Sequence, residues 1–167
     1  MYLWIRILHV LLGAIWVGFI VFTVVFLTPA MNVLGPDAAK LMAALRQRGL
    51  VIALPIIAGL TIVTGIYLYW RFTAGFSPEV SRTHAGMAFG IGGVLGIIAY
   101  IIGAGIVSVN MVKAMKLSEQ LLSTPEAQRA GLMATIAGHR KRAALASQVV
   151  AVLVVLAVMF MAAAPRL

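Results

Sequence analysis

The sequence predicts an all-α integral membrane protein, an up-down bundle of four membrane-spanning helices that extend into the cytoplasm. Hydrophobic residues make up 63% of its 167 positions and charged residues 10%, whereas a soluble domain has about 25% charged residues. Four apolar stretches are each long enough to cross a bilayer core, which takes about 20 helical residues. None alternates in polarity as a membrane β-strand does. A soluble enzyme, a secreted binding module and a disordered chain are therefore excluded.

The first apolar stretch covers residues 3–27, and we expect it to be a retained helix. It is longer than the apolar region of a signal peptide, which has about 7–15 residues. At 100° per residue, its polar, aromatic and small side chains share one face, which we expect to look into the bundle. The residues of that face are Tyr2, Arg6, His9, Gly13, Trp16, Ile20 and Thr23.

Three further spans follow in the same domain, residues 1–167, and the connections between spans are predicted to be helical. Gly35-Pro36-Asp37 is typical of a helix start, and this helix is expected to run into the second span. Thr124 is the expected N-cap of a helix that leads into the fourth span. The three spans are residues 51–70, 84–109 and 143–163.

Lysine and arginine residues are distributed unequally between the two sides of this bundle. The excess predicts a cytoplasmic side that includes the connections 1–2 and 3–4, and so a bacterial inner-membrane protein with both termini in the periplasm. The same bias explains the net charge of +9, so nucleic acid is not an expected partner. The cytoplasmic set is Lys40, Arg46, Arg48, Lys113, Lys116, Arg129, Arg140, Lys141 and Arg142, and the opposite set is Arg6, Arg71, Arg82 and Arg166.

Several kinds of chemistry are excluded by what the chain lacks. It has no cysteine, so it forms no disulfide, iron–sulfur cluster or thiolate site. Its four acidic residues all fall in connections, which excludes a carboxylate proton relay or a di-iron centre inside the spans. These residues are Asp37, Glu79, Glu119 and Glu126.

Two histidines are the candidates for chemistry inside the membrane. His9 lies about 10 Å into the first span, where an ionisable side chain is a functional candidate. His84 begins the third span on the same side of the bundle. Two imidazoles from different helices are typical axial ligands of b-type haem, so His9 and His84 form a candidate pair. The alternatives are a hydrogen bond from His9 to a neighbouring helix and solvation of His84 by headgroups.

Residues near this pair are candidates for contacts with the rest of a haem. Arg6 and Arg71 suit haem propionates, because arginine binds carboxylates with bidentate geometry. An ordinary interfacial belt is the alternative for these side chains. Trp16 shares the His9 face of the first span.

Glycines are frequent in the third span and have two interpretations. Gly92 and Gly96 lie nearer to His84 and would leave room for a macrocycle. Gly86 and Gly90 lie on the opposite face, where they would let another helix approach closely, in a homodimer or a larger complex.

Copper is a competing ligand. His84 and Met87 are three residues apart on one helical face, and imidazole with thioether suits Cu(I). His139, beside a basic run at the cytoplasmic end, is expected to be solvated or to bind headgroups.

The first span, LWIRILHVLLGAIWVGFIVFTVVFLTPAM, resembles the opening helix of the CopD-like and HemJ-like bacterial membrane proteins. His9, Trp16, Gly18 and Pro29 match their pattern W-x-[KR]-x-[LI]-H…W-x-G with a following proline. The HemJ-like resemblance implies b-type haem with His9 as a ligand, and protoporphyrinogen oxidation. The third span departs from that pattern, because SRTHAGMAFG lacks the HemJ-like lysine. The CopD-like resemblance implies copper handling.

Together these observations predict a haem b-binding membrane redox protein that transfers electrons near the periplasmic side. A haem-dependent oxidoreductase activity, a quinone partner and a homodimer are part of this expectation. One alternative is a non-catalytic subunit, without a cofactor, of a larger respiratory or photosynthetic membrane complex. The other is copper handling.

Overall fold

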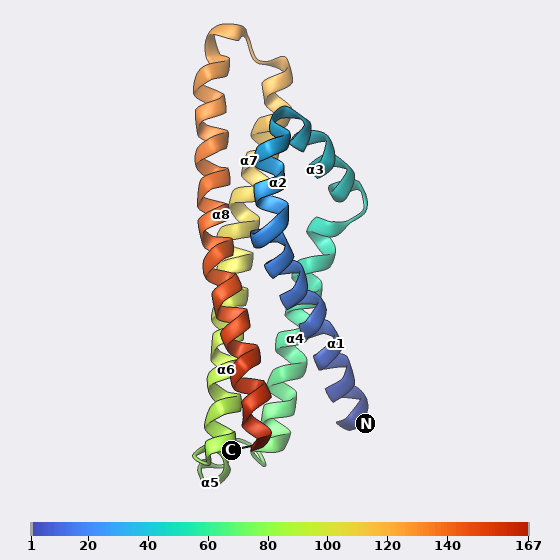
Figure 1. Ribbon diagram of the computed structural model, residues 1–167, viewed down its shortest axis with the longest axis vertical. Helices are drawn as coiled ribbons and strands as arrows, with labels where there is room; N and C mark the ends of the chain where they lie inside the picture. The colour runs from blue at the N-terminus through green and yellow to red at the C-terminus, as the bar shows by residue number, and fades with distance from the viewer. Residues whose placement is uncertain (1, 167) are drawn as a thin grey trace.

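Four long helices form the molecule in a computed structural model that describes residues 2–166, without the side chains of residues 36, 39 and 122 (Figure 1). Each is long and apolar enough to cross a membrane. The all-α four-helix bundle expected from the sequence is thereby confirmed. The long helices cover Tyr2–Leu34, Leu50–Phe72, His84–Gln120 and Glu126–Arg166.

The first long helix contains a π-helical turn. It consists of α1 (Tyr2–Phe22), η1 (Thr23–Leu27) and α2 (Thr28–Leu34). Pro29 stands in the first turn of α2. A proline inside a helix lacks the backbone N–H and clashes with the carbonyl four residues earlier. The carbonyl four residues before Pro29 belongs to η1, and the wider π-helical turn relieves the clash with it.

The connection to the second span is a separate helix. The 3₁₀ turn η2 (Gly35–Asp37) is followed by α3 (Ala38–Gln47). Two residues separate α3 from α4 (Leu50–Phe72). The expected continuous helix is wrong, because Gly49 between them has a φ of 77°. Glycine adopts this left-handed conformation without a steric penalty, and the helix is interrupted there.

A strained turn joins α4 to the short helix α5 (Pro78–Ser81). Ala74 and Phe76 have φ values of 50° and 66°, in a region that side chains disfavour. Thr73 is fully buried and stabilises the turn. Its Oγ1 donates a hydrogen bond to Tyr69 O (2.8 Å) and accepts one from Phe76 N (3.0 Å).

The third and fourth long helices form a hairpin that extends beyond the other two at one end (Figure 1). The third consists of α6 (His84–Ile102), the π-helical η3 (Gly103–Ser108) and α7 (Val109–Gln120). After η4 (Leu121–Ser123), α8 (Glu126–Ala163) returns through the bundle to η5 (Ala164–Arg166).

The expectation that Thr124 caps α8 is wrong. Pro125 occupies the N-cap position, and the Thr124 hydroxyl donates a hydrogen bond back to Gln120 O (2.8 Å).

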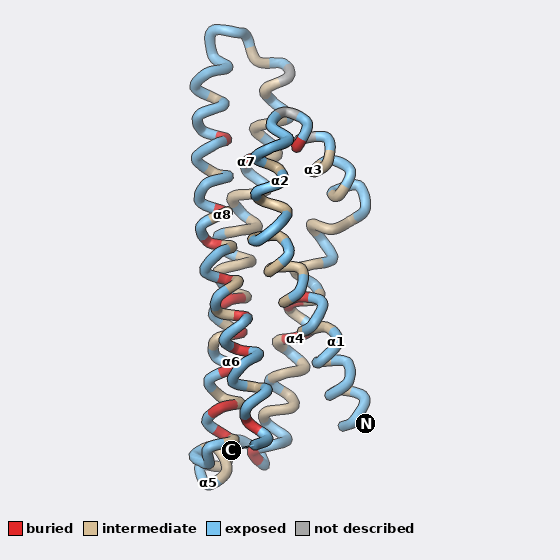
Figure 2. The backbone as a smooth tube through the Cα atoms, viewed as in Figure 1, coloured by how far each residue is buried: buried red, intermediate tan, exposed pale blue. Residues whose placement is uncertain are grey.

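The core lies mainly between α6 and α8. Small residues allow these helices to approach closely, and the buried residues concentrate along their contact (Figure 2). Trp16 is the one residue of α1 that is buried, and it packs into the same core. The central cluster is Trp16, Ala58, Ala99, Val150 and Val154.

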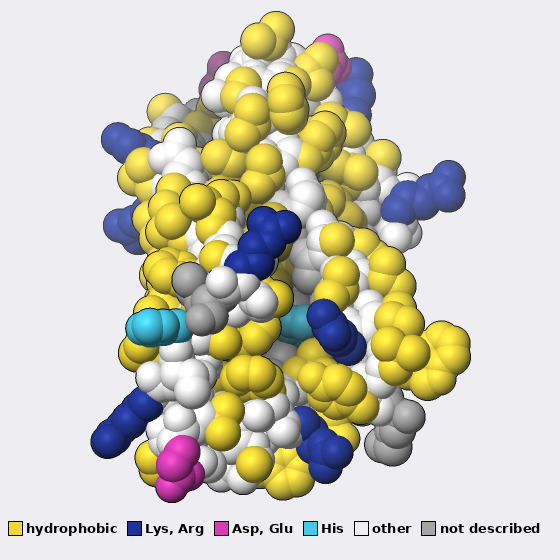
Figure 3. All heavy atoms as spheres, turned by 60° about the horizontal axis from the view of Figure 1, so that its bottom comes forward, with side chains coloured by type: hydrophobic (Ala, Val, Ile, Leu, Met, Phe, Trp, Pro, Cys, Tyr) yellow, Lys and Arg dark blue, Asp and Glu magenta, His cyan; other side chains and the backbone are white. Residues whose placement is uncertain are grey.

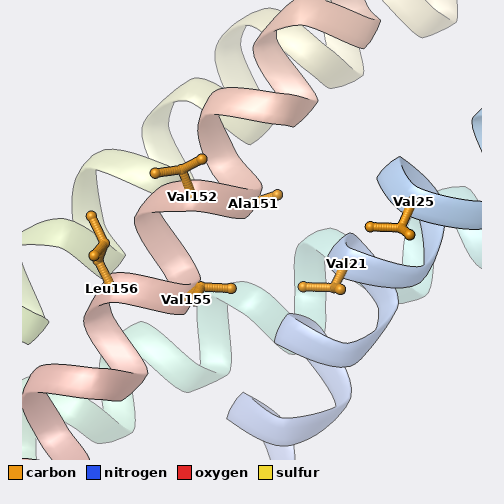
Figure 4. A pocket seen from close by; sticks show the side chains of 6 residues that line it. All are labelled: Val21, Val25, Ala151, Val152, Val155 and Leu156. Atoms are coloured by element: carbon orange, nitrogen blue, oxygen red, sulfur yellow. The ribbon is translucent and has the colours of Figure 1, made fainter.

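The N-terminal part of α1 diverges from the rest of the bundle and stays in contact mainly with α4 (Figure 1). A groove of about 280 Å³ lies between the other end of this helix and α8. Val21 and Val25 point across it toward Ala151 and Val155 (Figure 4). Val152 and Leu156 complete the lining. Because every lining residue is aliphatic, the groove suits hydrocarbon and offers no side-chain partner to a polar headgroup.

Candidate functional site

His9 hydrogen-bonds to α4 through one ring nitrogen. Its Nδ1 lies 3.0 Å from Thr61 O and 3.1 Å from Thr64 Oγ1. A carbonyl oxygen only accepts hydrogen bonds, so Nδ1 carries the proton in this arrangement. The Thr64 hydroxyl donates its own proton to Leu60 O (2.7 Å) and accepts from the imidazole. Nε2 is left with a free lone pair and has no hydrogen bond to any residue of the described chain.

Gly65 provides the surface on which this imidazole lies. A Cβ atom at Gly65 would be 2.9 Å from His9 Cε1 and 3.5 Å from its Nδ1. Any larger residue would push the ring out of its hydrogen bonds. One turn deeper, Gly13 faces Thr61, with 3.7 Å between its would-be Cβ and Thr61 Cγ2. The α1–α4 contact is thus polar and small on both sides.

The predicted inward face of the first helix is confirmed from His9 onward. His9, Gly13 and Thr23 are half-buried and Trp16 is buried, whereas Arg6 nearer the N-terminus is exposed. The divergence of α1 explains the exposed end. Trp16, however, packs among core residues of α4, α6 and α8. The structure therefore places Trp16 in the packing between helices, and its contact with a cofactor stays a prediction.

Arg6 and Arg71 lie at the same end of two helices that pack against each other. Arg6 is one turn before His9 on α1, and Arg71 is in the last turn of α4. Both side chains are exposed. Figure 3 shows this end of the molecule with cationic side chains scattered among hydrophobic ones, and with histidines at separate places.

His84 is the first residue of α6 and is exposed. Thr83, the N-cap, accepts a hydrogen bond from Gly86 N through its hydroxyl (3.1 Å). Met87 is also exposed, at 45%. Among residues 2–166, no group of three or more His, Asp or Glu side chains is close enough together to hold a metal ion.

The contacts between helices set the relative height of the two histidines. A Cβ atom at Gly96 would lie 3.6 Å from Ile62 Cδ1, so Gly96 and Ile62 lie at a similar height along the bundle axis. His9 is bonded to Thr61, next to Ile62, and is therefore level with the middle of α6. His84 lies about 12 residues before Gly96, which is about 18 Å at 1.5 Å per residue.

The structure therefore does not bring His9 and His84 together as an axial pair. Two ligands of one haem must bind opposite sides of the same iron atom. α1 packs on α4 and α4 on α6, so the two histidines differ in height and also sit on different sides of α4. A helical projection shows which face of a helix a residue occupies, but not the height at which two helices pack. The pairing of His9 with His84 was predicted without this height and therefore differs from the structure.

Gly92 faces α8 so closely that it leaves no room for a macrocycle there, which corrects its expected role, whereas Gly96 is in ordinary contact with Ile62. A Cβ atom at Gly92 would be 2.9 Å from Met161 Cγ and 3.0 Å from Ala157 O. Both glycines are buried, Gly92 against α8 and Gly96 against Ile62 of α4. Their lack of a side chain serves close packing within the bundle.

Gly86 and Gly90 also serve contacts within the chain. A Cβ atom at Gly86 would meet Val80 O at 2.1 Å, and one at Gly90 would meet the Tyr69 hydroxyl at 2.9 Å. This hydroxyl donates a hydrogen bond to Gly86 O (3.2 Å). The two glycines therefore face neighbours within the chain, and the expected homodimer stays a prediction.

The sequence analysis missed the partners that position the histidines. Thr61, Thr64 and Gly65 are a local group of small and hydroxyl residues in a largely apolar span, and that composition was the available signal. At the opposite end, His139 Nδ1 lies 2.8 Å from Asn110 Oδ1. A lone asparagine inside the third helix was the signal for this second contact.

Comparisons with protein-family models, curated proteins and solved structures give no match to this chain.

Proposed function

We propose that this chain is a b-type haem-binding membrane redox protein in which His9 is the axial ligand. The observation that carries the proposal is the orientation of the His9 imidazole. Ligating histidines usually donate one ring N–H to a carbonyl or carboxylate, which fixes the tautomer and frees the other nitrogen for the metal. His9 donates from Nδ1 to Thr61 O and leaves Nε2 free.

The cations beside His9 support an amphipathic, acidic ligand such as haem. Arg6 and Arg71 flank the α1–α4 contact on the side toward the membrane surface. Haem propionates would bind these guanidinium groups while the macrocycle stays among apolar side chains. The chain's own contribution is to hold the imidazole through Thr61 and Thr64 and to exclude water with its apolar helices. Bound haem would supply one-electron chemistry.

The haem is proposed to lie near the periplasmic side. Nine of the thirteen Lys and Arg residues belong to α3, α7, α8 and the turn after α3. Positive charge favours the cytoplasm, which puts both termini and the His9 end at the periplasmic face of a bacterial inner membrane. A quinone is the natural electron partner in that membrane.

The height difference between the histidines changes the expected iron coordination. Because His84 of the same chain lies at a different height, His9 is the one histidine of the pair that would hold haem iron within a monomer.

The test is the visible spectrum of the purified protein, oxidised and dithionite-reduced, with a pyridine haemochrome assay. His9→Ala is expected to abolish the Soret band, while His84→Ala and His139→Ala keep it at full stoichiometry. Absence of haem from the wild type, after expression with added haem, overturns the proposal. Equal loss in His84→Ala would instead support a bis-histidine site that joins two chains.

A second candidate is a non-catalytic subunit of a larger membrane complex. It is favoured by glycines that no residue in the described part of the chain covers. Gly18, Gly93 and Gly105 would have no atom within 4 Å of an added Cβ, so another helix of a second copy or a different subunit can approach there. A colourless protein whose size in native membranes exceeds that of a dimer would favour this candidate.

A further inference from the structure

A pocket of about 320 Å³ lies between α7 and α8, at the end of the bundle remote from both termini. One face of α7 and one residue of α8 form it. Its residues on α7 are spaced by three or four positions, so they lie above one another on the helix. The lining residues are Lys113, Lys116, Leu117, Gln120 and His139.

The pocket is cationic. No carboxylate lines it, and Glu119 on the same helix is engaged in an ion pair with Arg46 of α3. The other salt bridge found among residues 2–166 lies at the start of α3. Lys113 and Lys116 thus form none within the described part of the chain. The pocket therefore suits an anion, which would accept hydrogen bonds from the ammonium groups of Lys113 and Lys116 and the amide of Gln120.

His139 has a fixed orientation at the wall of this pocket. Asn110 Nδ2 donates a hydrogen bond to Ile106 O (2.8 Å), which directs the amide oxygen toward the imidazole. His139 Nδ1 then donates to Asn110 Oδ1 (2.8 Å). The network thus fixes the imidazole ring at the wall of the pocket, beside the two lysines.

The backbone beneath this network is irregular. Ile106 belongs to η3, a π-helical segment. Such turns disturb the regular backbone pattern and are frequent at functional sites. Asparagine is itself a weak helix former. The π-helical segment and the asparagine are both locally unfavourable, and both lie where the His139 imidazole is oriented. This coincidence indicates a specific site rather than a chance grouping of lysines.

The depth of the pocket matches the headgroup layer of a bilayer. Lys113 lies about 29 residues beyond His84, or about 43 Å along the helix. His139 lies about 24 residues before Ala163, or about 36 Å. A bilayer with its headgroups is about 40–45 Å thick. A lipid whose phosphate occupies the pocket would lay its acyl chains along the apolar parts of η3 and α8.

We propose that this pocket binds the phosphate of an anionic phospholipid in the leaflet that faces α3. Basic pockets between membrane helices recognise such headgroups. The proposal does not depend on haem binding.

The test is a titration of the purified full-length protein with phosphatidylglycerol, followed by native mass spectrometry, with phosphatidylcholine as the neutral comparison. The double variant Lys113→Gln/Lys116→Gln is expected to weaken binding about thirtyfold, given the contribution of each surface lysine. The matched control is Lys141→Gln/Arg142→Gln, which removes the same charge at a similar depth outside the pocket, and it should change affinity less than twofold. Asn110→Leu, which releases His139 without changing charge, should weaken binding severalfold.

Three outcomes would overturn the proposal. Equal losses in the pocket and control variants would mean diffuse attraction to the basic surface. Binding of inorganic phosphate as tightly as phosphatidylglycerol, or equal binding of phosphatidylcholine, would exclude an anionic lipid as the specific occupant. Unchanged binding in Asn110→Leu would remove the role of His139.

Discussion

The α6–α8 contact and the α1–α4 contact join helices in opposite ways. α6 packs on α8 through buried glycine, alanine and valine residues, and a Cβ atom at Gly92 would collide with Ala157 O. α1 is held on α4 by the His9 imidazole, which reaches a carbonyl and a hydroxyl, and its N-terminal half diverges from the bundle. In a bilayer the α6–α8 contact is stabilised by dense packing, and the α1–α4 contact is stabilised by a few hydrogen bonds. The rigid pair is therefore the scaffold, and the looser pair carries the side chain suited to chemistry.

The largest effect is expected from Gly92→Leu, which breaks the packed contact. The new side chain would meet Met161 Cγ at 2.9 Å and the backbone at Ala157 O at 3.0 Å, and a backbone atom cannot rotate away. We expect the free energy of unfolding to fall by about 3 kcal/mol.

Gly93→Leu is the matched control, because an added Cβ there has no neighbour within 4 Å. It should change stability by less than about 0.5 kcal/mol. Unfolding by sodium dodecyl sulfate, followed by circular dichroism in mixed micelles, measures both. Similar losses in the two variants would mean that α6 and α8 do not pack as described.

A smaller loss is expected from Gly65→Ala, which sharpens the comparison at the polar contact. The methyl group would lie 2.9 Å from His9 Cε1 and displace the ring from Thr61 O. Interhelical hydrogen bonds in membranes contribute about 0.6–2 kcal/mol, so a loss of about 1 kcal/mol is expected.

The effect of Gly65→Ala should nearly vanish in a His9→Ala background, where the methyl group has space. Gly18→Ala, on the uncovered face of α1, is the control and should be neutral. A double-mutant cycle in the same micelles measures the coupling. A coupling of zero would mean that His9 does not lie on Gly65.

A loss of about 0.5–1 kcal/mol is expected from Tyr69→Phe, which removes one hydrogen bond between α4 and α6. The Tyr69 hydroxyl donates to Gly86 O at 3.2 Å, at the upper end of the normal range. Tyr67→Phe is the control, since its hydroxyl bonds to no residue of the described chain. Equal stability of Tyr69→Phe and wild type would show that close packing alone holds α6 against α4.

The smallest effect is expected outside the membrane, at the start of α5. A hydrogen bond from the Ser77 hydroxyl lowers the pKa of the Glu79 carboxyl below its ordinary value, assisted by a backbone N–H. Such a bond stabilises the fold above the unfolded-state pKa, and this gain disappears as the pH falls through the folded-state pKa. Because Glu79 is fully exposed, stability should scarcely change. Ser77→Ala should raise the pKa of Glu79, as measured by carbon-13 NMR titration, and an unchanged value would contradict the bond.

The fold was predictable because span length and hydropathy are properties of single segments. The inward face of α1 was equally predictable, since His9, Gly13 and Trp16 recur at helical spacing. His9 was singled out by its place in an apolar span, and the structure shows that its imidazole hydrogen-bonds to α4. The break at Gly49 was missed because glycine within a polar helical pattern is ambiguous until its φ is known.

The details of the site depend on the height at which neighbouring helices pack against one another. This height cannot be inferred from a single sequence. His84 was paired with His9 because both lie near the same end of a span. Contacts such as Gly96 with Ile62 set the actual height and separate the two histidines by several turns. In the sequence, a glycine at position 92 looks the same whether it contacts a macrocycle or Met161. Only the packing of α6 against α8 could distinguish these two roles.

The length of α8 has a practical consequence for imaging. At about 1.5 Å per residue its 38 residues span about 57 Å, nearly twice the about 30 Å of a hydrocarbon core. The tip around Leu121–Ser123 therefore projects well clear of a detergent belt. A 17.8 kDa protein gives little signal for aligning particles in electron cryomicroscopy. An antibody fragment or a rigid fusion placed at this tip would provide such a marker, and it would also report directly which side of the membrane the hairpin occupies.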